Sequence, residues 1–283
     1  MSLFIFNFNM KIFIRKIFLF LSGAIVLLNI LAWLVLLTPN PVSRQFSWFR
    51  IYERILRAQS GIRSDTIYIG DSVGNQFFRF ENTPNSLTAN GAILMAGHYM
   101  LASIAVENNP GIKKIVLATV PTELFRDFEK QATYNNLLKP FFSFSNLKYF
   151  SPLVYRKMRK KPLSFLCIFK AVKVLPFSDI NFSNNVEDHF GMSDISLEYL
   201  VKLKNMCDEK NIELKLVSLP VPAFRLKESN DWEKLRRLIN EKHMEEIFGD
   251  YLDKVIYIDP QCFKDRLHLK NQYIGMYKKM IRT

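Results

Sequence analysis

Cysteine, histidine and acidic residues are all scarce in this chain of 283 residues, which has three cysteines, four histidines and 26 acidic residues. Cys167, Cys207 and Cys262 are widely spaced, so they form no pair of the kind that binds zinc. An odd number of cysteines also cannot all be bridged within one chain. We expect these residues to be small buried side chains, and the sequence predicts no metal site.

The shortage of acidic residues leaves a large positive charge. With 39 basic residues, the formal net charge is +13. Such a charge suits nucleic acid, anionic lipid headgroups or acidic polymers. No zinc-finger spacing and no RNA-binding signature accompanies it, so we expect no nucleic-acid partner. Nearly half of the residues are apolar and 25 are phenylalanine, which argues against disorder and suits one α/β domain with appendages.

A long stretch near the N-terminus, from Ile17 to Leu37, contains no charged residue. As a helix it would be roughly 30 Å long at about 1.5 Å per residue, which matches the apolar core of a bilayer. The stretch is apolar on every face, unlike a helix at the surface of a soluble domain. Residues 34–39 offer no small-residue cleavage site, so we predict a retained transmembrane signal anchor over residues 17–37.

The residues on either side of this anchor bear on its orientation. Lys11, Arg15 and Lys16 precede it, and Trp33 lies near its far end, where interfacial aromatic residues are common. We therefore predict a cytoplasmic tail over residues 1–16 and a single-pass membrane protein whose domain is extracytoplasmic (periplasmic). The opposite orientation is favoured by the arginines that follow the anchor, Arg44, Arg50, Arg54 and Arg57.

After the anchor the sequence alternates between strand-like and helix-like patterns. Residues 38–61 form a linker in which prolines end the membrane helix and 46–59 is an amphipathic helix. We expect strands at 66–70, 86–89, 114–120, 213–219 and 255–258, and helices at 73–80, 92–106, 196–210, 232–248 and 271–281. The alternation predicts an α/β domain over 62–283, of the flavodoxin-like kind, with a three-layer, doubly wound parallel sheet. The segment 121–195 is too long for a simple connection, and we expect a helical insertion over the active-site edge.

Two short motifs follow the first and the last of these strands. The first strand ends in Gly70-Asp71-Ser72, and the last is followed by Asp265 and His268 in an Asp-x-x-His pattern. Each motif alone is common. The carboxyl ends of parallel strands meet at one edge of a sheet, so these side chains can converge there. A serine needs a base to take its proton and a carboxylate to orient that base, so we predict a triad of Ser72, His268 and Asp265.

Together the two motifs resemble the first and last blocks of the SGNH/GDSL hydrolase superfamily. The resemblance covers residues 62–283 and implies an SGNH hydrolase-like fold and serine ester chemistry with no cofactor and no metal. It also implies that a glycine N–H of a second block helps to bind the oxyanion. Gly97 is the expected donor by its order in the chain, Gly91 is the alternative, and Asn90 belongs to the same block. The asparagine of the third block is missing; Thr122 could donate weakly there, or Asn90 could substitute.

This departure is typical of divergent, membrane-anchored relatives that resemble alginate O-acetylation proteins and the D-alanine transfer protein of teichoic acid. The resemblance implies a serine acyltransferase or esterase acting on O-acyl groups, foremost O-acetyl groups, of a cell-envelope glycan. It also implies a multispanning acyltransferase as a partner. Two alternatives stay open: a non-catalytic glycan-binding or assembly protein on an SGNH scaffold, and a lipid esterase. The basic, aromatic part of the insertion suits a sugar polymer, lipid headgroups or a solvated helix face.

Overall fold

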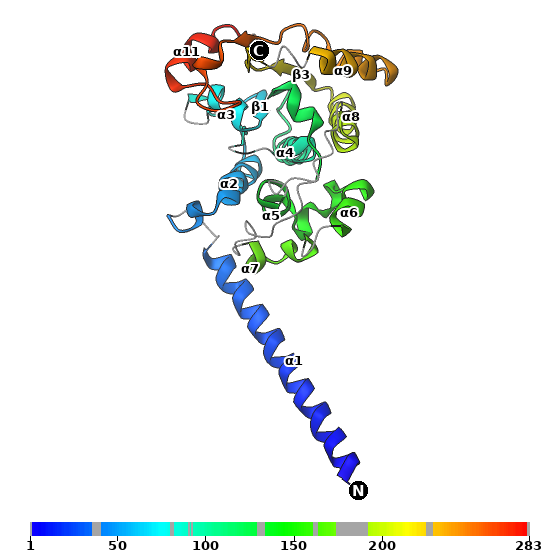
Figure 1. Cartoon of the computed structure of the whole chain (residues 1–283). Helices are drawn as coiled ribbons and strands as arrows, with labels where there is room; N and C mark the ends of the chain where they lie inside the picture. The colour runs from blue at the N-terminus through cyan, green and yellow to red at the C-terminus, as the bar shows by residue number, and fades with distance from the viewer. Residues whose placement is uncertain are drawn as a thin grey trace.

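The computed structural model describes residues 2–35, 41–79, 82–89, 91, 93–128, 134–160, 164–173, 192–224 and 229–281. Within these residues the chain is a mixed α/β protein with a parallel sheet and one long N-terminal helix (Figure 1). That helix, α1 (Ser2–Val35), projects away from the domain. Its part from Met10 to Val35 is long and apolar enough to cross a membrane, and it is almost entirely exposed.

The sheet is built from the β-branched runs of the sequence. β1 (Thr66–Gly70), β2 (Lys114–Thr119) and β3 (Glu213–Ser218) are parallel and lie in the order β1-β2-β3. The segment 86–89 adjoins β1 in parallel, since Ala89 donates to the carbonyl of Gly70 at 2.8 Å, but it forms only a single bridge. Directly after β3, β4 (Val221–Pro222) pairs in parallel with β5 (Tyr257–Ile258). The four main expected strands are therefore present, and the last one is short.

Side chains that alternate along the strands fill two apolar cores, one on each face of the sheet. Ile67, Ile69 and Leu117 pack into the core shared with the helices α2 (Ser47–Gln59), α4 (Leu94–Asn108) and α8 (Asp194–Glu209). Val116 and Ala118 face the other core, which lies under α3 (Ser72–Phe77) and α11 (Asn271–Lys278). α9 (Ser229–Glu241) and α10 (Glu245–Phe248) complete the domain beside β3.

The insertion is helical in its described parts, and its position differs from the expectation. It contains η3 (Pro121–Phe125), η4 (Tyr134–Leu138), α5 (Lys139–Phe141), η5 (Phe144–Tyr149), α6 (Pro152–Arg159), η6 (Ser164–Ile168) and α7 (Lys170–Lys173). η4 and α5 pack on α2 and α7 packs on α1, so this part of the insertion lies on the side of the domain that faces α1, whereas η3 follows β2 directly (Figure 1). The cause is apolar burial: the aromatic side chains Phe141, Phe142 and Phe150 join the core of α4.

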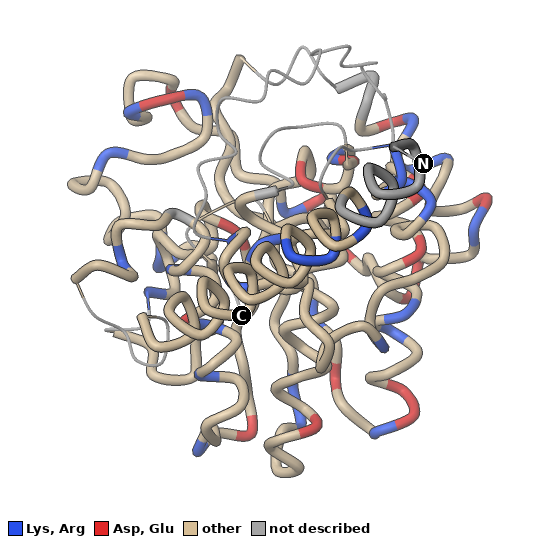
Figure 2. Tube along the Cα trace, turned by 90° about the horizontal axis from the view of Figure 1, so that it is seen from below, with Lys and Arg blue, Asp and Glu red and all other residues tan. Residues whose placement is uncertain are grey.

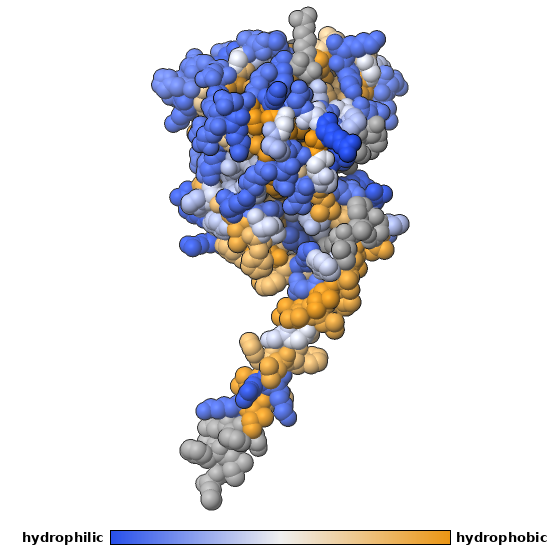
Figure 3. Space-filling view, turned by 180° about the vertical axis from the view of Figure 1, so that it is seen from behind, coloured by the Kyte–Doolittle hydropathy of each residue, from blue (hydrophilic) through white to orange (hydrophobic). Residues whose placement is uncertain are grey.

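Charge and hydropathy are unevenly distributed over the surface. In the view from below, where α1 is seen nearly end-on, blue Lys and Arg positions are more frequent than red Asp and Glu positions (Figure 2). The space-filling view from behind is mostly hydrophilic over the domain, whereas α1 and the adjoining underside of the domain are hydrophobic (Figure 3). Of the cysteines, Cys167 and Cys207 are buried as expected, and Cys262 is half-buried; all three are free thiols.

Two glycines let α3 approach the sheet closely. Gly70 ends β1 and Gly74 lies in the first turns of α3, and both face the carbonyl oxygen of Ala118 on β2. A Cβ atom on Gly74 would stand 2.7 Å from that oxygen, closer than real side chains come. The helix that begins at Ser72 can therefore lie against β2 only because these two positions carry no side chain.

We predict that Gly74→Ala lowers the free energy of unfolding by about 1–3 kcal/mol, because the backbone of α3 or β2 must move. Gly275→Ala is the matched control, since a Cβ at Gly275 in α11 meets no atom within 4 Å. Alanine there should stabilise by up to about 1 kcal/mol through helix propensity. Urea denaturation of both variants measures this; equal effects at the two positions would contradict the close approach.

Candidate active site

The nucleophile candidate stands at the start of α3, immediately after β1. Asp71 is the N-cap of this helix: its Oδ1 accepts from the N–H groups of Val73 at 2.9 Å and Gly74 at 3.1 Å. Its backbone carbonyl accepts from Asn75 at 2.8 Å. Ser72, the first helical residue, is half-buried, and its own N–H is not among these three donors. The Gly-Asp-Ser sequence thus forms a strand–cap–helix turn with the serine at the sheet edge.

Three side chains from the two ends of the sequence form one chain of hydrogen bonds. His268 Nε2 lies 2.9 Å from Ser72 Oγ. His268 Nδ1 lies 3.0 Å from both carboxylate oxygens of Asp265. The imidazole is 25% exposed and the carboxylate 51% exposed, so the site opens to solvent. The structure therefore brings Ser72, His268 and Asp265 together, with the histidine between the other two.

The tight turn after β5 explains how Asp265 reaches the histidine. One oxygen of Asp265 accepts from the backbone N–H groups of Leu267 at 2.9 Å and His268 at 2.8 Å. Burial raises the pKa of Asp265, but these two N–H groups and the imidazole outweigh it, so the pKa lies below its ordinary value. The carboxylate is ionised at neutral pH and can hold the imidazole in the tautomer whose Nε2 accepts the serine proton.

A buried glutamine fixes this loop above the nucleophile helix. Gln76 Nε2 donates to the carbonyl of Leu269, and Gln76 Oε1 accepts from the Leu269 N–H, both at 3.0 Å. The glutamine is buried, and Leu269 adjoins His268 in sequence. An antiparallel bridge between Phe263 and Leu269 closes the same loop. Sequence reasoning did not identify Gln76; its only local signal is that it lies four residues after Ser72, on the same helix face.

A buried pair of carboxyl groups lies beside the nucleophile. Asp71 is 2% exposed and Glu123, from η3 after β2, is fully buried. Arg126 reaches Glu123 with Nε 2.6 Å from Oε2. Burial raises the pKa of both carboxyl groups, although Arg126 and nearby backbone N–H groups act in the opposite direction. One guanidinium cannot neutralise two buried carboxylates, so burial and the repulsion between the two groups favour retention of one proton by the pair.

Gly97, the expected oxyanion donor, has a different role. Its N–H donates to the carbonyl of Ile93 at 3.1 Å within α4, so it is not available to a ligand. A Cβ on Gly97 would come 2.9 Å from Cβ of Ile93 and 3.3 Å from the ring of Phe141, so the glycine makes room for both side chains. Helical periodicity alone did not distinguish this packing glycine from a loop glycine.

The alternative donor, Gly91, lies past the strand ends. Ser86 pairs with Tyr68 in parallel and Ala89 donates to the carbonyl of Gly70, so Gly91 and Ser72 each follow the end of their strand segment at the same edge of the sheet. A Cβ on Gly91 would stand 3.1 Å from Oδ1 of Asn136, so an asparagine of η4 packs against this glycine. Asn136 belongs to none of the sequence motifs described above. Asn90 lies outside the described residues.

Two further polar residues near this edge have defined environments. The hydroxyl oxygen of Thr122, after β2, is buried and has no hydrogen-bond partner among the described residues. His98 is fully buried inside α4, and burial lowers its pKa to about 3. His98 is therefore neutral at physiological pH and belongs to the apolar core around α4.

Comparisons with known proteins found no match: no family model, no curated protein and no solved structure matches the chain. The interpretation of the site therefore depends on its own geometry and chemistry.

We predict that Gln76→Ala lowers kcat for a small ester by roughly tenfold to a hundredfold while changing KM little, because a freed loop misplaces His268. Gln261→Ala is the matched control, since this exposed glutamine lies in the turn before the same loop. The measurement is steady-state kinetics with circular dichroism to confirm folding. A Gln76 variant with unchanged kcat and wild-type stability would remove its positioning role.

Proposed function

We propose that this chain is a membrane-anchored serine acyltransferase or esterase in which Ser72 is the nucleophile, His268 the general base and acid, and Asp265 the orienting carboxylate. The observation that carries the proposal is the continuous set of hydrogen bonds from Ser72 Oγ through the imidazole to the Asp265 carboxylate, at 2.9 and 3.0 Å. A side-chain hydroxyl, an imidazole and a carboxylate in this order form the arrangement that activates a serine for acyl transfer.

In this mechanism Ser72 Oγ attacks the carbonyl carbon of an ester while its proton moves to His268 Nε2. The tetrahedral intermediate collapses, and the imidazolium gives that proton to the departing alkoxide, which leaves the acyl group on Ser72. An acceptor hydroxyl then loses its proton to Nε2 and attacks the acyl-serine. The serine leaves with the proton from the imidazolium, and the acyl group is on water or on a sugar hydroxyl. Asp265 stays ionised and stabilises the imidazolium in both halves.

The negative charge that develops on the carbonyl oxygen must be stabilised by hydrogen-bond donors. The N–H of Ser72 at the start of α3 is one candidate. Gly91 is the second, because it follows the segment 86–89 at the sheet edge where Ser72 follows β1. The amide of Asn136, which packs against Gly91, supplies the chemical group that is missing after β2. We assign these three groups to the oxyanion site in place of Gly97.

The strand arrangement supports an SGNH hydrolase-like fold. The segment 86–89 adjoins β1, β2 and β3 follow on the other side, and β5 pairs with β4 at the end of β3. Read outward in this way, the order matches that of flavodoxin-like doubly wound sheets. Helices on both faces of the sheet support three layers.

For the substrate, we propose O-acyl groups, foremost O-acetyl groups, of a cell-envelope glycan, with the domain on the extracytoplasmic side. In Figure 1, α3 and α11 lie in the half of the domain away from α1, and α5 and α7 lie between. A serine in that position is poorly placed for the ester bonds of a lipid in the bilayer that α1 would span. This disfavours the lipid esterase, and an acyl donor from a multispanning partner remains part of the proposal.

One observation favours a non-catalytic role as the second candidate. The N–H of Gly97 is used within α4, and η3 after β2 offers no asparagine. Loss of one oxyanion donor lowers the rate by on the order of a hundred- to a thousandfold. A scaffold with a weak oxyanion site could bind a glycan without turning it over.

Labelling with a serine-directed fluorophosphonate separates these two candidates. The full chain should react, and Ser72→Ala should lose at least about 99% of the labelling, because no other hydroxyl is activated by His268. Ser60→Ala, at an exposed serine after α2, is the control and should label like the wild type. An unlabelled wild-type chain with intact folding would favour the non-catalytic protein.

A further inference from the structure

A polar cleft of about 600 Å³ opens between the linker helix and the nucleophile helix. It lies at the junction of η1 (Ser43–Gln45), α2, α3 and the loop that leads to Asp265. The lining consists of Arg44, Arg50, Glu53, Arg54, Asn75, Arg79, Asn82 and Lys264.

The lining is strongly basic, with five cationic side chains and one carboxylate among the described residues. The carboxylate, Glu53, pairs with Arg44 at 3.1 Å. The Nε of Arg54 donates to the carbonyl of Thr88 at 3.1 Å, which fixes this guanidinium in place. Arg50 on α2 and Arg79, two residues after the end of α3, are both exposed and both line the cleft. Like charges gathered in a cleft concentrate the field toward an anion.

Two residues that line the cleft are close in sequence to the proposed catalytic residues. Asn75 lies three residues after Ser72 on α3, and Lys264 immediately precedes Asp265. A molecule held in the cleft therefore contacts the helix that carries Ser72 and the loop that carries Asp265 and His268. Arginine forks bind phosphate and carboxylate groups with paired hydrogen bonds, so the lining fits an anionic group better than a neutral sugar.

We propose that this cleft binds an anionic group, phosphate or carboxylate, of the molecule that receives or loses the acyl group at Ser72. The role as an acyl acceptor depends on the proposed function, whereas the binding itself does not. The anionic group can belong to a soluble polymer or to a lipid headgroup, because the linker also adjoins α1.

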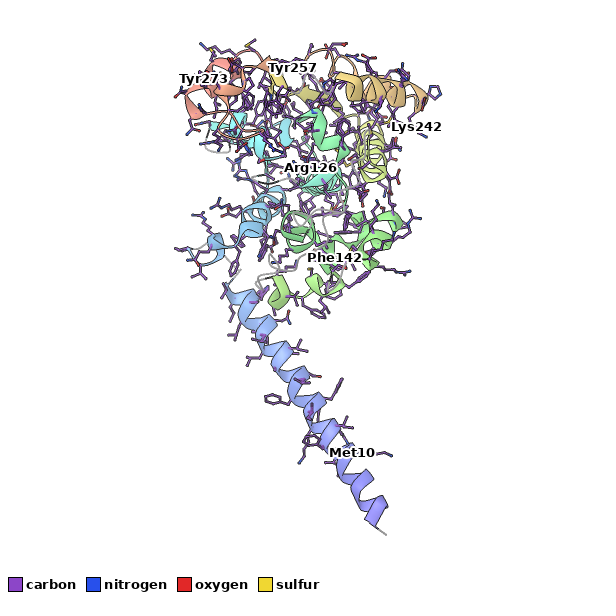
Figure 4. All side chains as sticks on the ribbon, in the orientation of Figure 1. Met10, Arg126, Phe142, Lys242, Tyr257 and Tyr273 are labelled. Atoms are coloured by element: carbon purple, nitrogen blue, oxygen red, sulfur yellow. The ribbon has the colours of Figure 1, made fainter. Side chains whose placement is uncertain are left out.

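The test measures binding by the full chain in nanodiscs of phosphatidylcholine. The probes are fluorescently labelled polyphosphate and polygalacturonate, with labelled dextran as the neutral probe, read by anisotropy. The cleft variant is Arg50→Gln with Arg79→Gln. The matched control is Arg237→Gln with Lys242→Gln, which removes the same charge from exposed residues; Lys242 is labelled on the opposite flank of the domain (Figure 4).

The cleft variant should bind the preferred anionic probe at least roughly tenfold more weakly at about 0.1 M salt, and the control within about twofold of the wild type. Equal weakening in both variants, or no binding of either anion, overturns the proposal. If anionic phosphatidylglycerol nanodiscs abolish binding in the wild type, the group is a headgroup; if binding persists, it is a soluble polymer. Ser72→Ala should bind normally. A wild-type chain that binds the anionic probe but does not react with the fluorophosphonate would contradict only the proposed catalysis.

A separate observation concerns the underside of the domain, where η6 and α7 adjoin α1. Phe165, Leu166 and Phe169 are 43%, 42% and 40% exposed. The space-filling view shows hydrophobic atoms on this underside beside the upper part of α1 (Figure 3). Phe142, which packs against Phe165 at 6.3 Å between ring centroids, is labelled in the same lower part of the domain (Figure 4). We call Phe165, Leu166 and Phe169 the membrane-facing patch.

The contacts of α7 with α1 set the depth of this patch. Ala171 N–H donates to the side chain of Asn29 at 3.2 Å, and Lys170 Nζ lies 5.5 Å from the centre of the Trp33 ring. If the span begins after Lys16, about 20 residues cross the hydrocarbon and end near residue 36. Asn29 then lies about 10 Å inside that boundary at about 1.5 Å per residue. Trp33 with a lysine above its ring is typical of the headgroup level.

From this register we infer that the membrane-facing patch inserts into the outer part of the same bilayer that α1 crosses. Its three large apolar side chains are then buried in lipid, whereas on a domain away from the membrane they would stay exposed to water. Beside them, Lys170 can extend toward anionic headgroups, as the positive net charge of the chain also favours.

Spin labels measure the depth directly in the full chain, in vesicles of phosphatidylcholine and phosphatidylglycerol. In a Cys262→Ser background, nitroxides are attached at Phe165→Cys and Phe169→Cys, with Ile25→Cys in α1 and Met276→Cys in α11 as controls. The two control side chains are both 53% exposed in the structure.

Labels at 165, 169 and 25 should collide preferentially with oxygen dissolved in lipid, and the label at 276 with a water-soluble nickel complex. Water-exposed labels at 165 and 169 beside a lipid-exposed label at 25 would overturn the patch and leave the anchor intact. A water-exposed label at 25 would overturn both.

Discussion

The geometry of the candidate active site depends on the pair of hydrogen bonds between Gln76 and the backbone of Leu269. These bonds join two segments that are 193 residues apart in the chain. Gln76 lies one helical turn after Ser72, so one face of α3 carries both the nucleophile and the residue that holds its base. Because both bonds are buried, water competes for them little, and the loop with His268 has few alternative positions. The 2.9 Å contact between Nε2 and Oγ follows from this attachment.

The helix that carries Ser72 is itself placed by features that cost stability. Asp71 and Glu123 are carboxyl groups with almost no exposure, and burial of such groups is unfavourable unless they are hydrogen-bonded or neutralised. Asp71 offsets part of this cost by capping α3, which is worth about 1 kcal/mol. Gly70 and Gly74 allow α3 to pack closely on β2, and Gly74 does so at the expense of helix propensity. The apolar cores on the two faces of the sheet stabilise the domain against these local losses.

The local parts of this arrangement could be predicted from the sequence, and the long-range parts could not. A β-branched run that ends in Gly-Asp-Ser predicts a strand and a turn, because strand propensity and capping are properties of neighbouring residues. The role of Gln76 depends on a partner near the other end of the chain, which no local pattern reveals. The position of Gly97 is similar, since only the approach of Phe141 distinguishes it from a glycine in a loop. The insertion was predicted as helical, but its aromatic residues do not indicate which side of the domain they cover.

The insertion also bears on what the site can reach. η4 and α5 pack on α2, α7 packs on α1, and the apolar underside of the insertion adjoins the upper part of α1 (Figure 3). With that underside in the bilayer, the edge that carries Ser72 and His268 faces away from the lipid. An ester in a phospholipid lies just below the headgroups, so hydrolysis there would require the lipid to leave the membrane. A polymer that extends from the envelope meets no such barrier. The basic cleft beside α3 would bind the anionic groups of such a polymer, while an acylated hydroxyl of the same polymer lies at Ser72.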